Sequence, residues 1–270
     1  MQNQIILSTG SCHKYGLYRF FEVAKKAGFK QIELIIDDNL DTRDATYIKK
    51  LERKFGLKII SVHSAMEFVY SWGDWKNRLK KSIELAKELK AKYLIVHSWE
   101  YSDSEFVMWL IKNQRSVYKS AKPVKVVIEN ATKRDDFTSG NSINPSYHFD
   151  VVGQFDSINF DTSHSATAEI DILEYFEKIK DKVNHIHLSD SDFRPHPKKP
   201  NNIEDCHLIP GRGKLPLKKF LKKLKTEKYS GPISIELWCE QYAKDPDKIT
   251  EELVIKNLKA AKKFVETNFK

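Results

Sequence analysis

Short hydrophobic runs recur about every thirty residues along this chain, and they are rich in Ile, Val, Leu and Phe. Runs of this length and composition are typical of buried β-strands. Eight of them are predicted as strands: QIILS (4–8), QIELII (31–36), KIISVH (58–63), KYLIVH (92–97), KVVIE (125–129), SINFD (157–161), HIHL (185–188) and PISIEL (232–237).

Each predicted strand is followed by a segment whose apolar residues repeat with the period of an α-helix. The fifth of these helices, NPSYHFDVVGQF (144–155), has the weakest pattern and an uncertain start. Strict alternation of strand and helix implies parallel strands joined by right-handed crossovers. Eight such units predict a single (β/α)₈ TIM barrel domain over residues 1–270, with its active site at the C-terminal ends of the strands.

Basic residues dominate the charge, and the net charge of +9 could indicate an anionic partner such as nucleic acid. However, 38 of the 46 basic residues are lysine, and they are scattered over the predicted helices. Lysine at such spacings usually forms a solvated outer face, whereas arginine is better suited to phosphate recognition. The composition therefore favours a solvated surface over a nucleic-acid footprint.

The three cysteines, Cys12, Cys206 and Cys239, have no CxxC spacing, so neither a disulfide framework nor a zinc ribbon is indicated. No apolar run is long enough to span a bilayer, and the N-terminal segment lacks a signal-peptide pattern. We expect a soluble cytoplasmic protein with free thiols and no membrane contact. The sequence leaves the oligomeric state open.

Six successive strands finish on a residue type that can bind a metal. These residues are His63, His97, Glu129, Asp161, His187 and Glu236. An unpaired carboxylate or imidazole under the mouth of a barrel is costly to bury, and a cation would compensate for that cost. Mixed oxygen and nitrogen ligands suit Zn²⁺, Mn²⁺ or Mg²⁺.

Each of these residues also has an ordinary structural explanation when it is considered alone. His63 or His97 could be a hydrogen-bonded histidine at a strand end, and Asp161 could cap the turn that follows it. Their shared position in a repeated unit favours a common site. His185 lies two residues deeper than His187 on the same face, so we expect it to pack inside the barrel or to orient a ligand.

Three further residues extend the candidate site. His164 follows Asp161 in the DTSH turn, and Asp205 and His207 are two apart in the loop after the seventh strand. The DxH pair could chelate a metal with His164, or it could simply stabilise the loop. The remaining histidines, His13, His148 and His196, lack this register and are predicted as surface or loop residues.

Along nearly its whole length the sequence resembles the xylose isomerase-like barrel superfamily. The most specific elements are VVIEN, NFDTSH, HIHLSD, the GRG turn at 211–213 and SIELW. In the sugar isomerase and epimerase branch, the resemblance implies that Glu129, Asp161, His187 and Glu236 hold one divalent metal. It further implies that the two glutamates act as acid and base on opposite faces of a sugar carbon.

The chemistry of that branch suits a sugar or sugar phosphate substrate. A divalent ion on the carbonyl and hydroxyl oxygens of a keto sugar stabilises the enediolate formed by loss of a neighbouring proton. A carboxylate can take that proton, and a second can return it. Arg212 is the candidate for binding a substrate phosphate or hydroxyl.

Endonuclease IV, in the same superfamily, provides the alternative hypothesis of a three-zinc phosphodiesterase acting at abasic sites in DNA. Its ligand types have counterparts here, with His63, His97, His164, Asp205 and His207 as possible additional metal ligands. The segment after Glu129 and the long, proline-rich loop after His187 depart from the endonuclease pattern, so we favour the isomerase. A barrel that binds sugar or metal without turnover is a third hypothesis.

Overall fold

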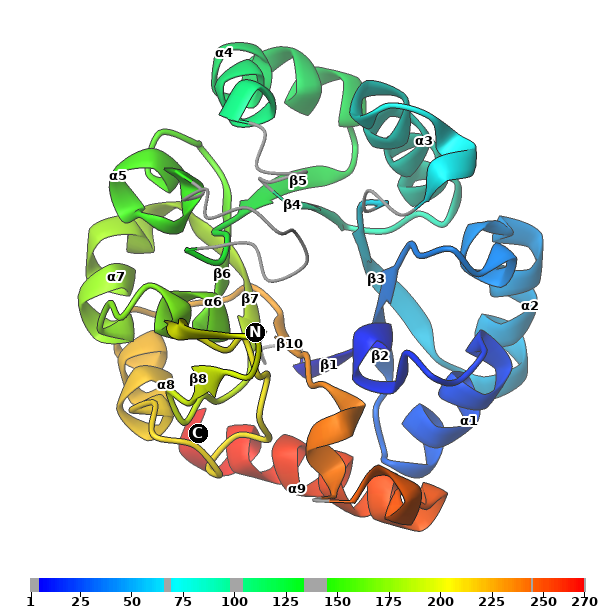
Figure 1. Ribbon diagram of the computed structural model, residues 1–270. Coiled ribbons are helices and arrows are strands. Elements are labelled where there is room, and N and C mark those ends of the chain that lie inside the picture. The colour runs from blue at the N-terminus through cyan, green and yellow to red at the C-terminus, as the bar shows by residue number, and fades with distance from the viewer. Residues whose placement is uncertain (1–4, 66–68, 98–103, 134–144, 244, 270) are drawn as a thin grey trace.

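Eight parallel strands form a closed barrel in the computed structural model, which describes residues 5–65, 69–97, 104–133, 145–243 and 245–269. Figure 1 shows the strands at the centre and the helices in a ring outside them. The order around the barrel is β1-β10-β7-β6-β5-β4-β3-β2. The barrel is closed because β1 pairs with β2 on one side and with β10, the last barrel strand in the chain, on the other. The predicted (β/α)₈ fold is therefore confirmed.

The strands lie within one or two residues of their predicted positions. They are β1 (Ile5–Ser8), β2 (Gln31–Ile35), β3 (Lys58–His63), β4 (Tyr93–His97), β5 (Lys125–Glu129), β6 (Ile158–Asp161), β7 (Val183–Leu188) and β10 (Ile233–Ile235). The helices are α1 (Leu17–Lys26), α2 (Ala45–Phe55), α3 (Trp75–Glu88), α4 (Ser104–Ala121), α5 (Phe149–Val152), α6 (Thr162–Thr167), α7 (Ile172–Ile179), α8 (Leu217–Thr226) and α9 (Glu251–Phe269).

Local sequence explains where the helices begin and end. The Asp44 side chain accepts a hydrogen bond from the backbone N–H of Tyr47 at 3.0 Å, which caps the first turn of α2. Gly56 then ends α2 with a φ of 64°, a conformation that glycine adopts without steric cost. In α8, Phe220, Leu221 and Leu224 are buried while most of the lysines face solvent, as the lysine pattern predicted.

Three features of the chain differ from the expected alternation. The fifth helical segment is reduced to α5, a single turn, in agreement with its weak pattern. The DTSHSAT stretch forms the additional short helix α6, which the sequence did not predict because it has no apolar stripe. After β7 the proline-rich loop contains a two-stranded antiparallel ribbon of β8 (Pro195–His196) and β9 (Lys199–Ile203).

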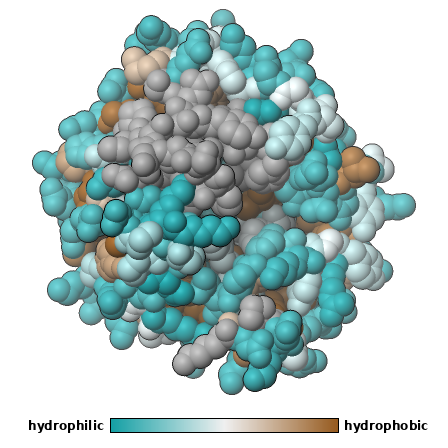
Figure 2. Space-filling view, in the orientation of Figure 1, coloured by the Kyte–Doolittle hydropathy of each residue, from teal (hydrophilic) through white to brown (hydrophobic). Residues whose placement is uncertain are grey.

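The hydrophobic core lies mainly between the strands and the surrounding helices. Phe160 on β6, Phe176 on α7 and Phe220 on α8 are buried and contact one another edge to face or at a tilt. Hydrophilic residues cover most of the coloured surface in Figure 2, which views the same face as Figure 1. Among the described residues, no helix is both long enough and apolar enough to span a membrane.

Candidate active site at the strand ends

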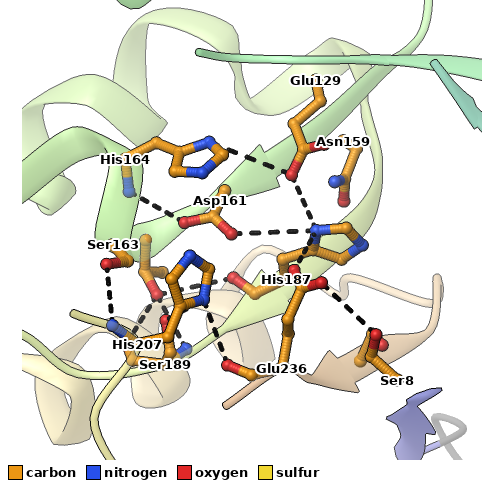
Figure 3. A network of polar contacts seen from close by, with 12 residues as sticks. Ser8, Glu129, Asn159, Asp161, Ser163, His164, His187, Ser189, His207 and Glu236 are labelled. Carbon is orange, nitrogen blue, oxygen red and sulfur yellow. Dashed lines mark hydrogen bonds and ion pairs between the residues drawn. The ribbon is translucent and has the colours of Figure 1, made fainter. Parts of the chain in front are cut away.

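Four polar side chains from four strands converge at the C-terminal end of the barrel (Figure 3). Glu129, Asp161 and His187 belong to β5, β6 and β7, and Glu236 directly follows β10. One ligand atom from each lies within 4.8 Å of the ligand atoms of the other three. Because parallel strands end on the same rim, residues far apart in sequence can meet at one point.

His187 lies at the centre of this group. Its Nδ1 is 2.7 Å from Glu129 Oε1 and 2.8 Å from Glu236 Oε2, and it is 3.7 Å from Asp161 Oδ2. Burial alone would lower the pKa of His187, but the surrounding carboxylates, Glu236 foremost, raise it well above its usual value. The same histidine holds the pKa of the buried Glu129 carboxyl well below its usual range, against the effect of burial. The three carboxylates around His187 Nδ1 therefore favour a positive charge between them.

The donor set fits a divalent cation. Asp161 Oδ2 is buried and has no hydrogen-bond partner, whereas Oδ1 caps α6 by accepting from the backbone N–H of His164. A buried carboxylate oxygen without a partner carries a desolvation cost that a metal ion would remove. Three carboxylates and one imidazole, all directed at one point, are an ordinary ligand set for zinc or manganese.

A second cluster shares Asp161 with the first. Ligand atoms of Asp161, His164 and His207 lie within 4.8 Å of one another. Asp205 Oδ2 is 3.4 Å from His164 Nε2 and 3.1 Å from His207 Nε2, and Asp205 Oδ1 accepts a hydrogen bond from Ser163 at 2.6 Å. These residues are buried, and the Asp205 charge raises the pKa of His207 to about 9 despite its burial. The structure thus brings the DxH pair and His164 to the edge of the first site.

His63 and His97 complete the rim on the other side. Nε2 of His63 is 3.2 Å from Glu129 Oε2, while Nδ1 donates to the backbone carbonyl of Ser64 at 3.0 Å. The rings of His63 and His97 are 6.1 Å apart, and His97 is 5.8 Å from the ring of His164. All nine predicted ligand residues therefore lie in one continuous group around Glu129 and Asp161.

Sequence reasoning missed Glu33, which lies in β2 and is fully buried inside the barrel. Its Oε1 is 2.9 Å from His187 Nε2 and accepts a hydrogen bond from Ser234 Oγ at 3.2 Å, and its Oε2 is 3.2 Å from His185 Nε2. The two histidines keep the pKa of Glu33 below its usual value although burial acts in the opposite direction. A glutamate within the hydrophobic run QIELI was the available signal, because charged residues are rarely buried without partners.

His185 lies one layer deeper than His187, as its position predicted. Its ring contacts Ser61 Oγ at 2.9 Å and Asn159 Oδ1 at 2.8 Å, in addition to Glu33. It is fully buried, and burial lowers its pKa. His185 therefore supports the layer of polar side chains beneath the strand-end cluster.

A cavity of about 970 Å³ opens above the strand ends. Seven of its lining residues come from the predicted set: His63, His97, Glu129, His164, Asp205, His207 and Glu236. Carboxylates from the loop after β2 and aromatic side chains such as Trp75 and Trp238 also line it. Within the described part of the chain, no lysine or arginine lines this cavity.

Arg212, the residue predicted to bind substrate, is not among the described residues that line the cavity. It is exposed, and its guanidinium donates to Asn257 Oδ1 on α9 at 2.7 Å. The GRG turn is held instead by Asp190, whose carboxylate accepts from the backbone N–H groups of Gly211 and Leu215. This turn orders the loop after β7 and directs Arg212 toward the outer helix.

Comparisons with known proteins agree with this architecture. An uncharacterized protein of Mycobacterium leprae is 26% identical over 256 residues, covering 86% of this chain and 87% of the relative. Fructoselysine 3-epimerase of Shigella flexneri is 25% identical over 177 residues, covering 62% and 60%. A crystal structure of IolI protein with a bound zinc atom superposes with a TM-score of 0.70 at 17% identity and covers 99% of both chains. A family model described as xylose isomerase-like TIM barrel matches residues 21–260, so the chain belongs to that family.

Proposed function

We propose that this protein is a divalent-metal-dependent isomerase or epimerase that moves a proton at a carbon next to a sugar carbonyl. The observation that carries the proposal is the convergence of Glu129, Asp161, His187 and Glu236 within 4.8 Å at the base of a large cavity. The similarity to fructoselysine 3-epimerase supports the same class of reaction.

The four residues divide into two pairs by their access to the cavity. Glu129 and Glu236 line it, whereas Asp161 and His187 are fully buried behind them and are not among its described lining residues. All four would hold the metal ion. Only the two glutamates, however, could also reach a substrate, so they are the candidates for acid and base.

When bound, a divalent cation would polarise the sugar carbonyl and make the neighbouring C–H bond more acidic. One glutamate, as the carboxylate, would remove that proton from carbon. The other would have to carry a proton when substrate is bound, and would deliver it to the opposite face or to the neighbouring carbon. The charge on His187 outweighs burial and lowers the pKa of Glu236, so this group is a carboxylate at neutral pH and can accept a proton. Ser8 Oγ donates to Glu236 Oε1 at 3.3 Å and helps to orient it.

The cavity lining favours a sugar without a phosphate group. Phosphate recognition normally uses Arg, Lys or clustered backbone N–H groups, and none of the described lining residues is Arg or Lys. Tyr15, Trp75 and Trp238 offer aromatic surface for the C–H faces of a sugar ring, while carboxylates such as Asp37 can accept bonds from hydroxyls. We therefore infer a neutral sugar or a sugar with a basic substituent.

The test is solvent deuterium exchange at the carbon next to the carbonyl, followed by NMR with a panel of free ketoses and their phosphate esters. We expect the protein to catalyse deuterium exchange into a free ketose. This exchange should stop when a chelator removes the metal from the protein, and it should return when Zn²⁺, Mn²⁺ or Mg²⁺ is added. Metal analysis should find about one ion fewer per chain in Asp161→Asn than in the wild-type protein. Absence of exchange in every metal-loaded sample would contradict the proposal.

A second candidate is a three-metal phosphodiesterase acting on DNA, and the shared Asp161 in two adjoining clusters favours it. His63 and His164 each direct Nδ1 at a backbone carbonyl, of Ser64 and Asn130 respectively, which leaves Nε2 available as a ligand atom. Three metals could clamp a phosphodiester and activate a hydroxide. The absence of Arg and Lys from the described cavity lining counts against a nucleic-acid substrate.

For this candidate we expect incision of a duplex with one abasic site, three metals per chain, and loss of incision in His164→Ala. His148→Ala is the matched control, because His148 caps α5 and is not among the described residues around the cavity. Incision that is unaffected by His164→Ala would point to a contaminating nuclease. No incision with excess zinc or manganese would remove the candidate.

A further inference from the structure

His13, Cys239 and Glu240 form a separate cluster at the mouth of the cavity, outside the strand-end site. His13 follows the short turn after β1, and the other two residues begin the turn after β10. Ligand atoms of the three lie within 4.8 Å of one another. His13 and Glu240 line the cavity, whereas Cys239 is buried beneath them.

We propose that these three residues form a second metal site, which takes a thiolate-binding divalent cation such as Zn²⁺. Imidazole, thiolate and carboxylate are the three protein ligand types of zinc, and a thiolate selects against Mg²⁺ and Ca²⁺. The strand-end cluster contains oxygen and nitrogen ligands only. The two sites therefore share no residue and differ in their preferred ions.

The distances between the ligand atoms match the edges of a tetrahedral zinc site. Bond lengths of about 2.0 to 2.3 Å to nitrogen, oxygen and sulfur imply ligand-to-ligand distances of about 3.3 to 3.6 Å. Nε2 of His13 lies 3.3 Å from Glu240 Oε1 and 3.7 Å from Cys239 Sγ, and Sγ lies 3.5 Å from Glu240 Oε2. The two edges to Glu240 use different carboxylate oxygens, so coordination requires either both oxygens of Glu240 or a rotation of this partly exposed carboxylate.

Hydrogen bonds between side chains and the backbone hold these two segments together in the absence of a metal. Ser11 Oγ donates to the Ile235 carbonyl at 3.2 Å and accepts from the Leu237 N–H at 3.1 Å. The Tyr242 hydroxyl donates to the Ser11 carbonyl at 2.7 Å. Because β1 and β10 pair directly, a metal at this place would link the first and last strands of the barrel.

The charged groups around the cluster are compatible with a bound cation. Lys14 Nζ pairs with Glu240 Oε1 at 2.9 Å, which leaves Oε2 on the side of Cys239. Zinc binds the deprotonated form of a cysteine side chain, so the Cys239 thiol must lose its proton on coordination. A zinc ion would replace that proton, and binding should release about one proton per ion from the thiol.

Cobalt(II) titration of the metal-stripped protein tests this site directly, since a cobalt–thiolate bond has a near-ultraviolet charge-transfer absorption that nitrogen and oxygen ligands lack. We expect this absorption in the wild-type protein and in Asp161→Asn, and its loss in Cys239→Ser. His13→Ala should weaken cobalt binding at this site at least about tenfold, since loss of even an outer-sphere partner costs that much. The His13 side chain is 45% exposed and lies outside the hydrophobic core, so this variant should fold.

Cys206→Ser is the matched control, because Cys206 is also a buried free thiol but its Sγ faces Ser191 and Asp192. It should retain the cobalt–thiolate absorption. The proposal is overturned if the wild-type protein shows no such absorption, or if Cys206→Ser removes it while Cys239→Ser does not. Neither result depends on the sugar reaction, because Asp161→Asn separates the two sites.

Discussion

Replacing Glu236 with glutamine is expected to lower kcat for the sugar reaction at least about 100-fold, because the amide cannot accept or deliver the proton. The metal should stay bound, since Glu129, Asp161 and His187 remain as ligands. The measurement is kcat on the substrate found by deuterium exchange, with metal content determined on the same sample. Glu236 lines the cavity, so the substitution removes a group that can transfer a proton and should have little effect on the fold.

The matched control for this prediction is Glu227→Gln. Glu227 is an exposed glutamate at the end of α8 that pairs with Lys180 at 3.1 Å, and it is not among the described residues that line the cavity. Its replacement should leave both kcat and metal content unchanged. Full activity in Glu236→Gln would refute the acid–base role, and loss of metal together with activity would show that Glu236 acts mainly as a ligand.

Replacing Glu33 with glutamine is expected to weaken metal binding at the strand-end site about 10- to 100-fold, although Glu33 would not itself be a ligand of the ion. The Glu33 carboxylate lies 2.9 Å from His187 Nε2 on the side opposite the other carboxylates. The contact lacks hydrogen-bond geometry, but the negative charge of Glu33 favours a proton on Nε2, which leaves Nδ1 for the metal. Calorimetric titration of the metal-stripped variant with Zn²⁺ or Mn²⁺ measures this effect without an activity assay.

The control for the Glu33→Gln prediction is Ser234→Ala, which changes another buried residue in contact with Glu33. Ser234 donates one hydrogen bond to Glu33 Oε1, so its removal should cost only about 1 kcal/mol of stability and leave His187 oriented. Thermal unfolding without metal shows whether each variant is folded. Unchanged metal affinity in a folded Glu33→Gln protein would mean that packing alone orients His187.

The barrel and its working face could be predicted because they depend on local patterns. Strand-like runs alternate with helical periods, and consecutive parallel units allow few topologies. The side chains at the ends of β3 to β7 could likewise be assigned to one rim, since the strands of a barrel all end on the same side. What the pattern could not predict is which of those side chains touch. The DTSHSAT helix escaped prediction for a related reason, as it lacks the apolar stripe that marks longer helices.

The sequence alone determined the fold, the end of the barrel that carries the site, and the types of residue at that end. It could do so because hydrophobic periodicity and strand ends are properties of neighbouring positions. Only the tertiary structure decided that Glu33 lies behind His187, that Arg212 binds α9, and that His13 meets Cys239 across the closure of the barrel. These contacts join residues from about 45 to more than 200 positions apart. They depend on strand register and loop path, which no local pattern encodes.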